Sequence, residues 1–80
     1  MFVREVKEVS MAPRNIKSER VRIDLSLKEA AEQLQVATNT LGNWEQGRTV
    51  PSGSDLARLA RFYGCSADWL LGITEERLPH

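Results

Sequence analysis

Apolar residues between positions 27 and 34 recur at intervals of three and four, which predicts a short helix with one apolar face. Ser26 precedes this helix and Glu29 follows three residues later, so the serine hydroxyl and the carboxylate predict a capping box at its start. Ala30 and Ala31 are small enough to let a following helix cross closely. The pattern therefore predicts a tight corner between two helices.

A second short helix is predicted from Thr38 to Gln46. Leu41 and Trp44 lie three residues apart and face inward, above Val36 in the turn. The outward positions carry only short polar side chains or none: Thr38, Asn39, Thr40, Gly42 and Asn43. Short amides and hydroxyls suit a surface that approaches base edges, because asparagine pairs with adenine in the major groove and threonine offers a hydroxyl and a methyl contact. The alternative interpretation is a polar face without a partner.

Another helix is indicated before this pair, from about Pro13 to Ile23. Proline suits its first turn, because the missing N–H group has no helical partner there. We expect Ile16, Val21 and Leu25 to supply its apolar contacts.

Two helices are indicated after the pair. The fourth helix begins after Ser52 or Ser54, and its apolar stripe consists of Leu56, Leu59, Ala60 and Tyr63. Arg58 and Arg61 fall mainly on its outer face, where we expect them to be solvated. A fifth helix begins at Ser66, and residues 73–80 look like a tail that frays beyond Glu76.

The order of these features resembles the Cro/repressor-type (xenobiotic-response-element type) helix-turn-helix family of bacterial and phage transcriptional regulators. The resemblance runs from about Pro13 to Gly72 and is sharpest in WEQGR through Pro51 and in SADWLLG. It implies an all-α, lambda-repressor-like fold of five helices over residues 13–72, with a short N-terminal extension over residues 1–12. Gln35 stands where the family usually has glycine, and a non-glycine residue with positive φ costs on the order of 1 kcal/mol.

The resemblance implies sequence-specific binding of double-stranded DNA by a repressor, with the helix from 38 to 46 in the major groove. The residues expected to read bases are Thr38, Asn39 and Asn43, with Ala37 close to the groove wall. Candidates for contacts to the DNA backbone are Arg48, Thr49, Thr40, Lys28, Lys17 and Arg14. By family position, Arg20 and Glu45 are expected to form a partly buried ion pair that fixes the reading helix and reads nothing itself.

A single module of this size usually gains specificity by dimerising, so we expect a homodimer on a roughly palindromic site. Its interface is open between the fifth helix and residues 1–12. Trp69, Leu70 and Leu71 are the candidates in the fifth helix, where the family often has a dimer contact. The competing interpretation of these three residues is that they belong to the core.

Composition bounds the remaining functions. The formal net charge is zero, with 11 basic and 11 acidic residues, which implies few phosphate contacts and a shallow salt dependence. Residues 13–28 nevertheless carry a local excess of positive charge, and residues 65–80 are acidic. Cys65 is the single cysteine, so no internal disulfide is possible, and a cytoplasmic, soluble protein without a membrane span is expected. We interpret Cys65 as a small buried hydrophobe.

Catalytic and metal-binding chemistry finds no support in the residues. His80 is the sole histidine and stands at the terminus, and no cysteine–histidine set has metal-ligand spacing. We therefore expect no enzymatic activity, no metal, no cofactor and no small-molecule ligand. The alternative function is a protein-binding antitoxin or anti-repressor module on the same scaffold, which the neutral net charge and the valines of residues 1–12 favour.

Overall fold

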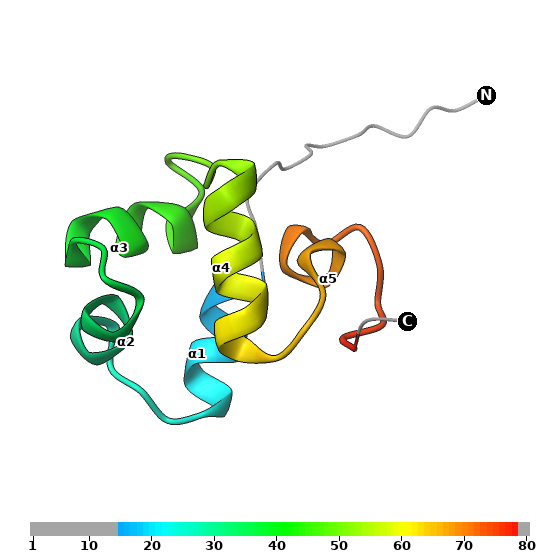
Figure 1. The fold of residues 1–80 in the computed structure, drawn as a ribbon, viewed down its shortest axis with the longest axis horizontal. Coiled ribbons are helices and arrows are strands. Elements are labelled where there is room, and N and C mark those ends of the chain that lie inside the picture. Colours follow the sequence, from blue (N-terminus) through cyan, green and yellow to red (C-terminus); the bar gives the residue numbers. More distant parts are fainter. Residues whose placement is uncertain (1–14, 79–80) are drawn as a thin grey trace.

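The computed structural model describes residues 15–78, in which all regular structure is helical (Figure 1). The five helices are α1 (Ile16–Arg22), α2 (Leu27–Leu34), α3 (Thr38–Gln46), α4 (Gly53–Tyr63) and α5 (Ala67–Leu71). The predicted all-α, five-helix fold is confirmed, and α3 has the predicted bounds. Predictions for residues 1–12, Pro13, Arg14 and His80 lie outside the described residues.

One apolar core joins the five helices. Figure 1 shows α4 between the α2–α3 pair on one side and α5 on the other. α1 contacts both α3 and α4, and α2 contacts the same two helices. The core consists of Ile16, Ala30, Ala31, Leu34, Leu41, Trp44, Leu59, Tyr63, Cys65 and Leu70. The burial of Ala30 and Ala31 between α2 and its neighbours confirms the close helix crossing expected from their small size.

Helix starts follow the local sequence. The Glu29 backbone N–H donates to Ser26 Oγ at 3.0 Å, and the Ser26 N–H donates to Glu29 Oε1 at 2.8 Å, which is the predicted capping box. Of the two serines considered for α4, Ser52 is the cap, because its Oγ accepts from the Asp55 N–H at 3.2 Å. These contacts join residues only three positions apart, so sequence spacing suffices to predict them.

The inner face of α1 differs from the prediction at one position. Val21 is 57% exposed and makes no contribution to the core, whereas Glu19 is 2% exposed. Ile16 and Glu19 lie three residues apart and therefore share a helix face, and Val21 falls on another side of the helix. The inner face of α1 therefore carries the Glu19 carboxylate, and Val21, which the apolar pattern placed inward, faces solvent.

Glu19 is held by donors from distant parts of the chain. It accepts hydrogen bonds from Arg22 Nε at 3.0 Å, from Trp69 Nε1 at 2.9 Å, and from Arg77 Nε and Nη2 at 2.7 and 2.9 Å. Burial by itself raises the pKa of Glu19, but the hydrogen bonds from Arg77, Trp69 and Arg22 outweigh it and hold the pKa below its usual value. The expectation that the chain frays beyond Glu76 is wrong at Arg77, because this residue is bound to the core.

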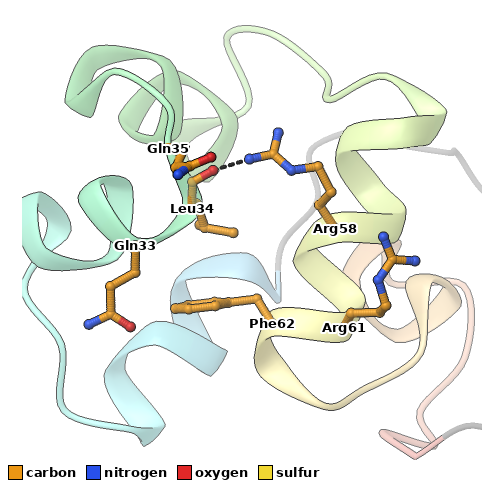
Figure 2. A pocket seen from close by; sticks show the side chains of 6 residues that line it. All are labelled: Gln33, Leu34, Gln35, Arg58, Arg61 and Phe62. Atoms are coloured by element: carbon orange, nitrogen blue, oxygen red, sulfur yellow. Dashed lines mark hydrogen bonds between the residues drawn. The ribbon is translucent and has the colours of Figure 1, made fainter.

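Arg58 also departs from its prediction. Its side chain is 40% exposed and donates to Asp55. It also donates to the Leu34 carbonyl, so it connects α4 to the end of α2 (Figure 2). Arg61 is exposed, as predicted, and its side chain makes no hydrogen bond to another described residue. The outer face of α4 therefore contains one structural arginine and one solvated arginine.

Candidate nucleic-acid interface

The two faces of α3 have opposite environments. Leu41 and Trp44 are 0% and 5% exposed, so they fix the helix against the core. Thr38 and Asn39, in its first turn, are exposed. Because the inner face is packed and the outer face is free of the core, α3 presents its hydroxyl and amide groups on a rigid support.

Asn43 and Arg48 are brought together where α3 ends. Gly47 ends the helix with a φ of 79°, a conformation that glycine adopts without steric cost. The chain then folds back, and the Arg48 backbone N–H donates to the Asn43 carbonyl at 2.9 Å. The Arg48 guanidinium also donates to Asn43 Oδ1 at 3.4 Å. A predicted base reader and a predicted backbone contact therefore lie side by side, both accessible to solvent.

Three smaller candidates surround this surface. Ala37 is the exposed residue before α3 and provides no side-chain cap. Thr40 is half-buried on α3, and Thr49 is exposed in the loop that follows Arg48. Ala37 thus lies before α3, Thr40 within it and Thr49 after it.

The basic residues are less available than their number suggests. Arg20 and Arg22 both form ion pairs within the domain, so the charge excess counted over residues 13–28 overstates what remains for a polyanion. Lys17 is exposed on α1. Lys28 is 76% exposed and pairs with Glu32 at 3.5 Å, a surface pair of little energetic value that leaves the lysine accessible. Arg14 lies outside the described residues.

The predicted partners Arg20 and Glu45 meet in a bidentate ion pair. Arg20 Nε and Nη2 donate to the two carboxylate oxygens of Glu45 at 2.7 and 3.0 Å, and the side chains are 13% and 5% exposed. Arg20 Nη1 also donates to the Leu25 carbonyl at 3.0 Å. The hydrogen bonds to Glu45 raise the pKa of Arg20, so the guanidinium stays charged. It joins α1 to the last turn of α3 and restricts how α3 can rotate.

The turn before α3 has the backbone conformation that the family resemblance implied. Gln35 has a φ of 64° and a ψ of 41°, in the left-handed region. This conformation costs a side-chain-bearing residue on the order of 1 kcal/mol, which the surrounding contacts must offset.

Gly42 does not belong to the outward face. A Cβ atom added at this position would lie 3.4 Å from Leu27 Cδ2. Gly42 therefore faces α2, where a methyl group would have room beside Leu27, and it does not leave a gap on the polar surface.

The three dimer candidates on α5 differ in how deeply they are buried. Leu70 is 0% exposed, so its side chain cannot touch a partner subunit, and its assignment as a dimer contact is wrong. Trp69 and Leu71 are half-buried and keep some accessible surface. The Trp69 indole N–H is bound to Glu19, which fixes the ring on the domain's own core.

Sequence reasoning missed Glu19, Arg58 and Arg77. A signal for Glu19 did exist, since it lies on the same helical face as Ile16, three residues away. Within residues 15–78, no group of three potential ligands is placed to hold a metal ion. None of the helices in that range is long and apolar enough to cross a membrane.

Comparison with known proteins places this geometry in a family. The helix-turn-helix family profile matches residues 16–70, which includes all five helices except the last residue of α5. The solution structure of the SOS-response transcriptional repressor LexA from Eubacterium rectale superposes with a TM-score of 0.70 at 18% identity, covering 88% of this chain and 78% of that chain. At this identity the likeness shows the fold.

Sequence relatives extend the comparison. The HTH-type transcriptional regulator ImmR of Bacillus subtilis is 36% identical over 62 residues, which are 78% of this chain and 49% of the relative. Antitoxin HigA-2 of Vibrio cholerae is 39% identical over 57 residues, 71% of this chain and 55% of the relative. The HTH-type transcriptional regulator DicA of Escherichia coli is 27% identical over 75 residues, 94% of this chain and 55% of the relative.

The chain spans about half the length of these curated relatives. The matched half contains the corner between α2 and α3, with its packed inner face and its polar outer face. The chain belongs to the helix-turn-helix family.

Proposed function

We propose that the domain binds double-stranded DNA sequence-specifically and acts as a transcriptional regulator, a repressor, by placing α3 in the major groove. The observation that carries this proposal is the exposed Thr38–Asn39 edge on a helix whose other side is locked by Leu41 and Trp44. A rigid helix with short polar side chains can approach base edges within hydrogen-bonding distance. The printed names of ImmR and DicA, both HTH-type transcriptional regulators, support the same function.

The proposed roles follow from the side-chain chemistry. Asn39 and Asn43 are suited to bidentate pairing with adenine, and Thr38 to a hydroxyl or thymine-methyl contact. Arg48 next to Asn43 is the strongest candidate for a phosphate contact, because it is exposed and its guanidinium lies beside the polar face of α3. The weaker backbone candidates are Thr49, Thr40, Lys28, Lys17 and Arg14, with Ala37 against the groove wall.

We also propose that the protein works as a homodimer in the cytoplasm. Trp69 and Leu71 retain accessible surface on α5, and Ile73 beside them is 70% exposed. A two-fold dimer would present two α3 helices to successive major grooves about 34 Å apart. No enzymatic activity, cofactor or small-molecule ligand forms part of this proposal.

Selection of bound sequences from a random duplex library tests the proposal. The expected result is an enriched motif with two-fold symmetry and half-sites about one helical turn apart. Double replacement of Asn39 and Asn43 by alanine should abolish the enrichment while the circular dichroism spectrum stays helical. Equal recovery of all sequences by the wild-type chain would refute sequence-specific binding, and an enriched motif without symmetry would refute the dimer alone.

The relative named Antitoxin HigA-2 favours a second candidate, a protein-binding antitoxin module on the same scaffold. Under this alternative, DNA retention by the wild-type chain is weak and unselective, and deletion of residues 1–12 breaks the complex with a protein partner. Under the first proposal the same deletion leaves site selection by α3 in place. DNA binding by the wild-type chain and by the deletion variant therefore distinguishes the two functions.

A further inference from the structure

Arg58 on α4 reaches across to the end of α2. Its Nη2 donates to the carbonyl of Leu34, the last residue of α2 (Figure 2). Its Nη1 donates to Asp55 Oδ1 at 3.3 Å. The last carbonyls of a helix lack partners within the helix, and α2 has no basic residue of its own in its last turn. Arg58 therefore supplies both a hydrogen bond and a positive charge at the negative end of the α2 dipole.

The carbonyl that Arg58 holds belongs to the turn before α3. The Leu34 carbonyl and the Gln35 N–H form one planar peptide group, so a fixed carbonyl direction restricts the φ angle of Gln35. That angle is 64°, the costly left-handed value. Three residues, 35–37, separate α2 from α3, so the orientation of this peptide group decides the direction in which α3 leaves the turn.

The same contacts lead to the other end of α3. Asp55, which accepts from Arg58, also accepts a hydrogen bond from Ser52 Oγ at 3.0 Å. Ser52 begins α4 directly after the loop that follows α3. A continuous set of hydrogen bonds, from Ser52 through Asp55 and Arg58 to Leu34, thus ties the turn before α3 to the loop after it.

We propose that Arg58 is a positioning residue for α3, which sets the angle at which the polar face is presented to DNA without touching DNA itself. The inference rests on the proposed function. A direct phosphate contact by Arg58 is the competing role, and it requires the guanidinium to abandon the Leu34 carbonyl and Asp55. The two roles differ in a measurable way. Each lost phosphate contact makes the negative slope of log K against log salt concentration shallower by about 0.9.

The test compares Arg58→Met with Arg61→Met in the full chain. Arg61 lies on the same helix and lines the same pocket as Arg58, but its side chain makes no hydrogen bond to another described residue (Figure 2). Both variants lose one positive charge and keep an unbranched apolar side chain. Affinities for a selected duplex and for an unrelated duplex are measured at several salt concentrations, well below the unfolding temperature of each variant.

For Arg58→Met we expect affinity for the selected duplex to fall about tenfold, as one hydrogen bond from a charged group predicts. Affinity for the unrelated duplex and the salt slope should stay as in Arg61→Met. Arg58→Lys should recover part of the loss, because an ammonium group can still donate to the Leu34 carbonyl. Equal losses for both duplexes with a shallower slope would make Arg58 a phosphate contact, and equal behaviour of the two variants would also overturn the proposal.

Backbone amide spectra decide the physical claim without DNA. Arg58→Met should shift the amide resonances of residues 35–38 and speed their hydrogen exchange, and Arg61→Met should leave them unchanged. If Arg58→Met does not fold, Arg58→Lys is compared with Arg61→Lys in the same way, and residues 35–38 should again shift only in the Arg58 variant. Unchanged resonances at residues 35–38 would refute the positioning role, whereas a wild-type chain that selects no duplex would refute the proposed function alone.

Discussion

Replacing Glu19 by glutamine should destabilise the domain while nearly preserving its shape. The carboxylate is 2% exposed and accepts from Arg22, Trp69 and Arg77. Hydrogen bonds to charged groups contribute roughly 1.5–3 kcal/mol each, but the two arginines are partly exposed and regain water when the charge is lost. We therefore expect the free energy of unfolding to fall by about 3 kcal/mol at pH 7. For a domain of this size, such a loss lowers the melting temperature by roughly 15 °C.

The lowered pKa of Glu19 determines how the stability difference between wild type and Glu19→Gln changes with pH. The pKa of Glu19 in the folded chain lies below its usual value of 4.5. A carboxyl with a lowered folded pKa stabilises the protein fully above its unfolded pKa and loses this contribution as the pH falls through the folded pKa. The stability difference between wild type and Glu19→Gln should therefore be constant near neutral pH and shrink below pH 4.5.

Urea denaturation followed by tryptophan fluorescence, repeated from pH 7 to pH 3, measures this difference. The control is Glu32→Gln, in which the replaced carboxylate is 64% exposed and pairs with Lys28 at the surface. This control should change the free energy of unfolding by less than about 0.5 kcal/mol. Curves for wild type and Glu19→Gln that stay parallel down to pH 3, or coincide at pH 7, would refute the assignment of Glu19 as a stabilising buried anion.

Three further predictions concern the turn, the helix crossing and the thiol. Gln35→Gly should raise the free energy of unfolding by up to about 1 kcal/mol in urea denaturation, because glycine adopts a φ of 64° without strain, and a loss would contradict the strain. Gly42→Ala should stabilise α3 by about 0.5–1 kcal/mol in the same assay, since the added methyl group makes an ordinary contact with Leu27, and destabilisation would show that the crossing is too tight. Burial raises the pKa of Cys65 to about 11, so alkylation by iodoacetamide at pH 8 should be slow until urea unfolds the chain. Labelling of Cys65 in the native protein at the rate of a free thiol would contradict its burial.

Local rules predicted most of the fold. The helix at 38–46 and the Ser26–Glu29 capping box both depend on residues within a few positions of each other. The role of Glu19 was not predictable in this way, because its donors Trp69 and Arg77 lie 50 and 58 positions away. No spacing rule joins an acid on the first helix to an arginine beyond the last one.

The candidate site also contains some features that local rules predict and others that depend on distant residues. The exposed edge of α3 follows from helical periodicity, because inward Leu41 and Trp44 leave the asparagine side outward. The Arg20–Glu45 pair, 25 positions apart, was accessible only through the family resemblance. Arg58 was predicted to be solvated. Its partner is the backbone carbonyl of Leu34, and the side-chain pattern of a sequence does not show which backbone carbonyls need a donor.

The proposed function requires individual side chains on the outer edge of α3 to read individual bases. Repeating the random-duplex selection with Asn39→Ala tests it most directly, because Asn39 is exposed on α3 and makes no hydrogen bond through its side chain to another described residue. The variant should lose base preference at one position of each half-site and keep the remainder of the wild-type motif. A motif unchanged at every position, from a variant that folds and binds like the wild type, would contradict it.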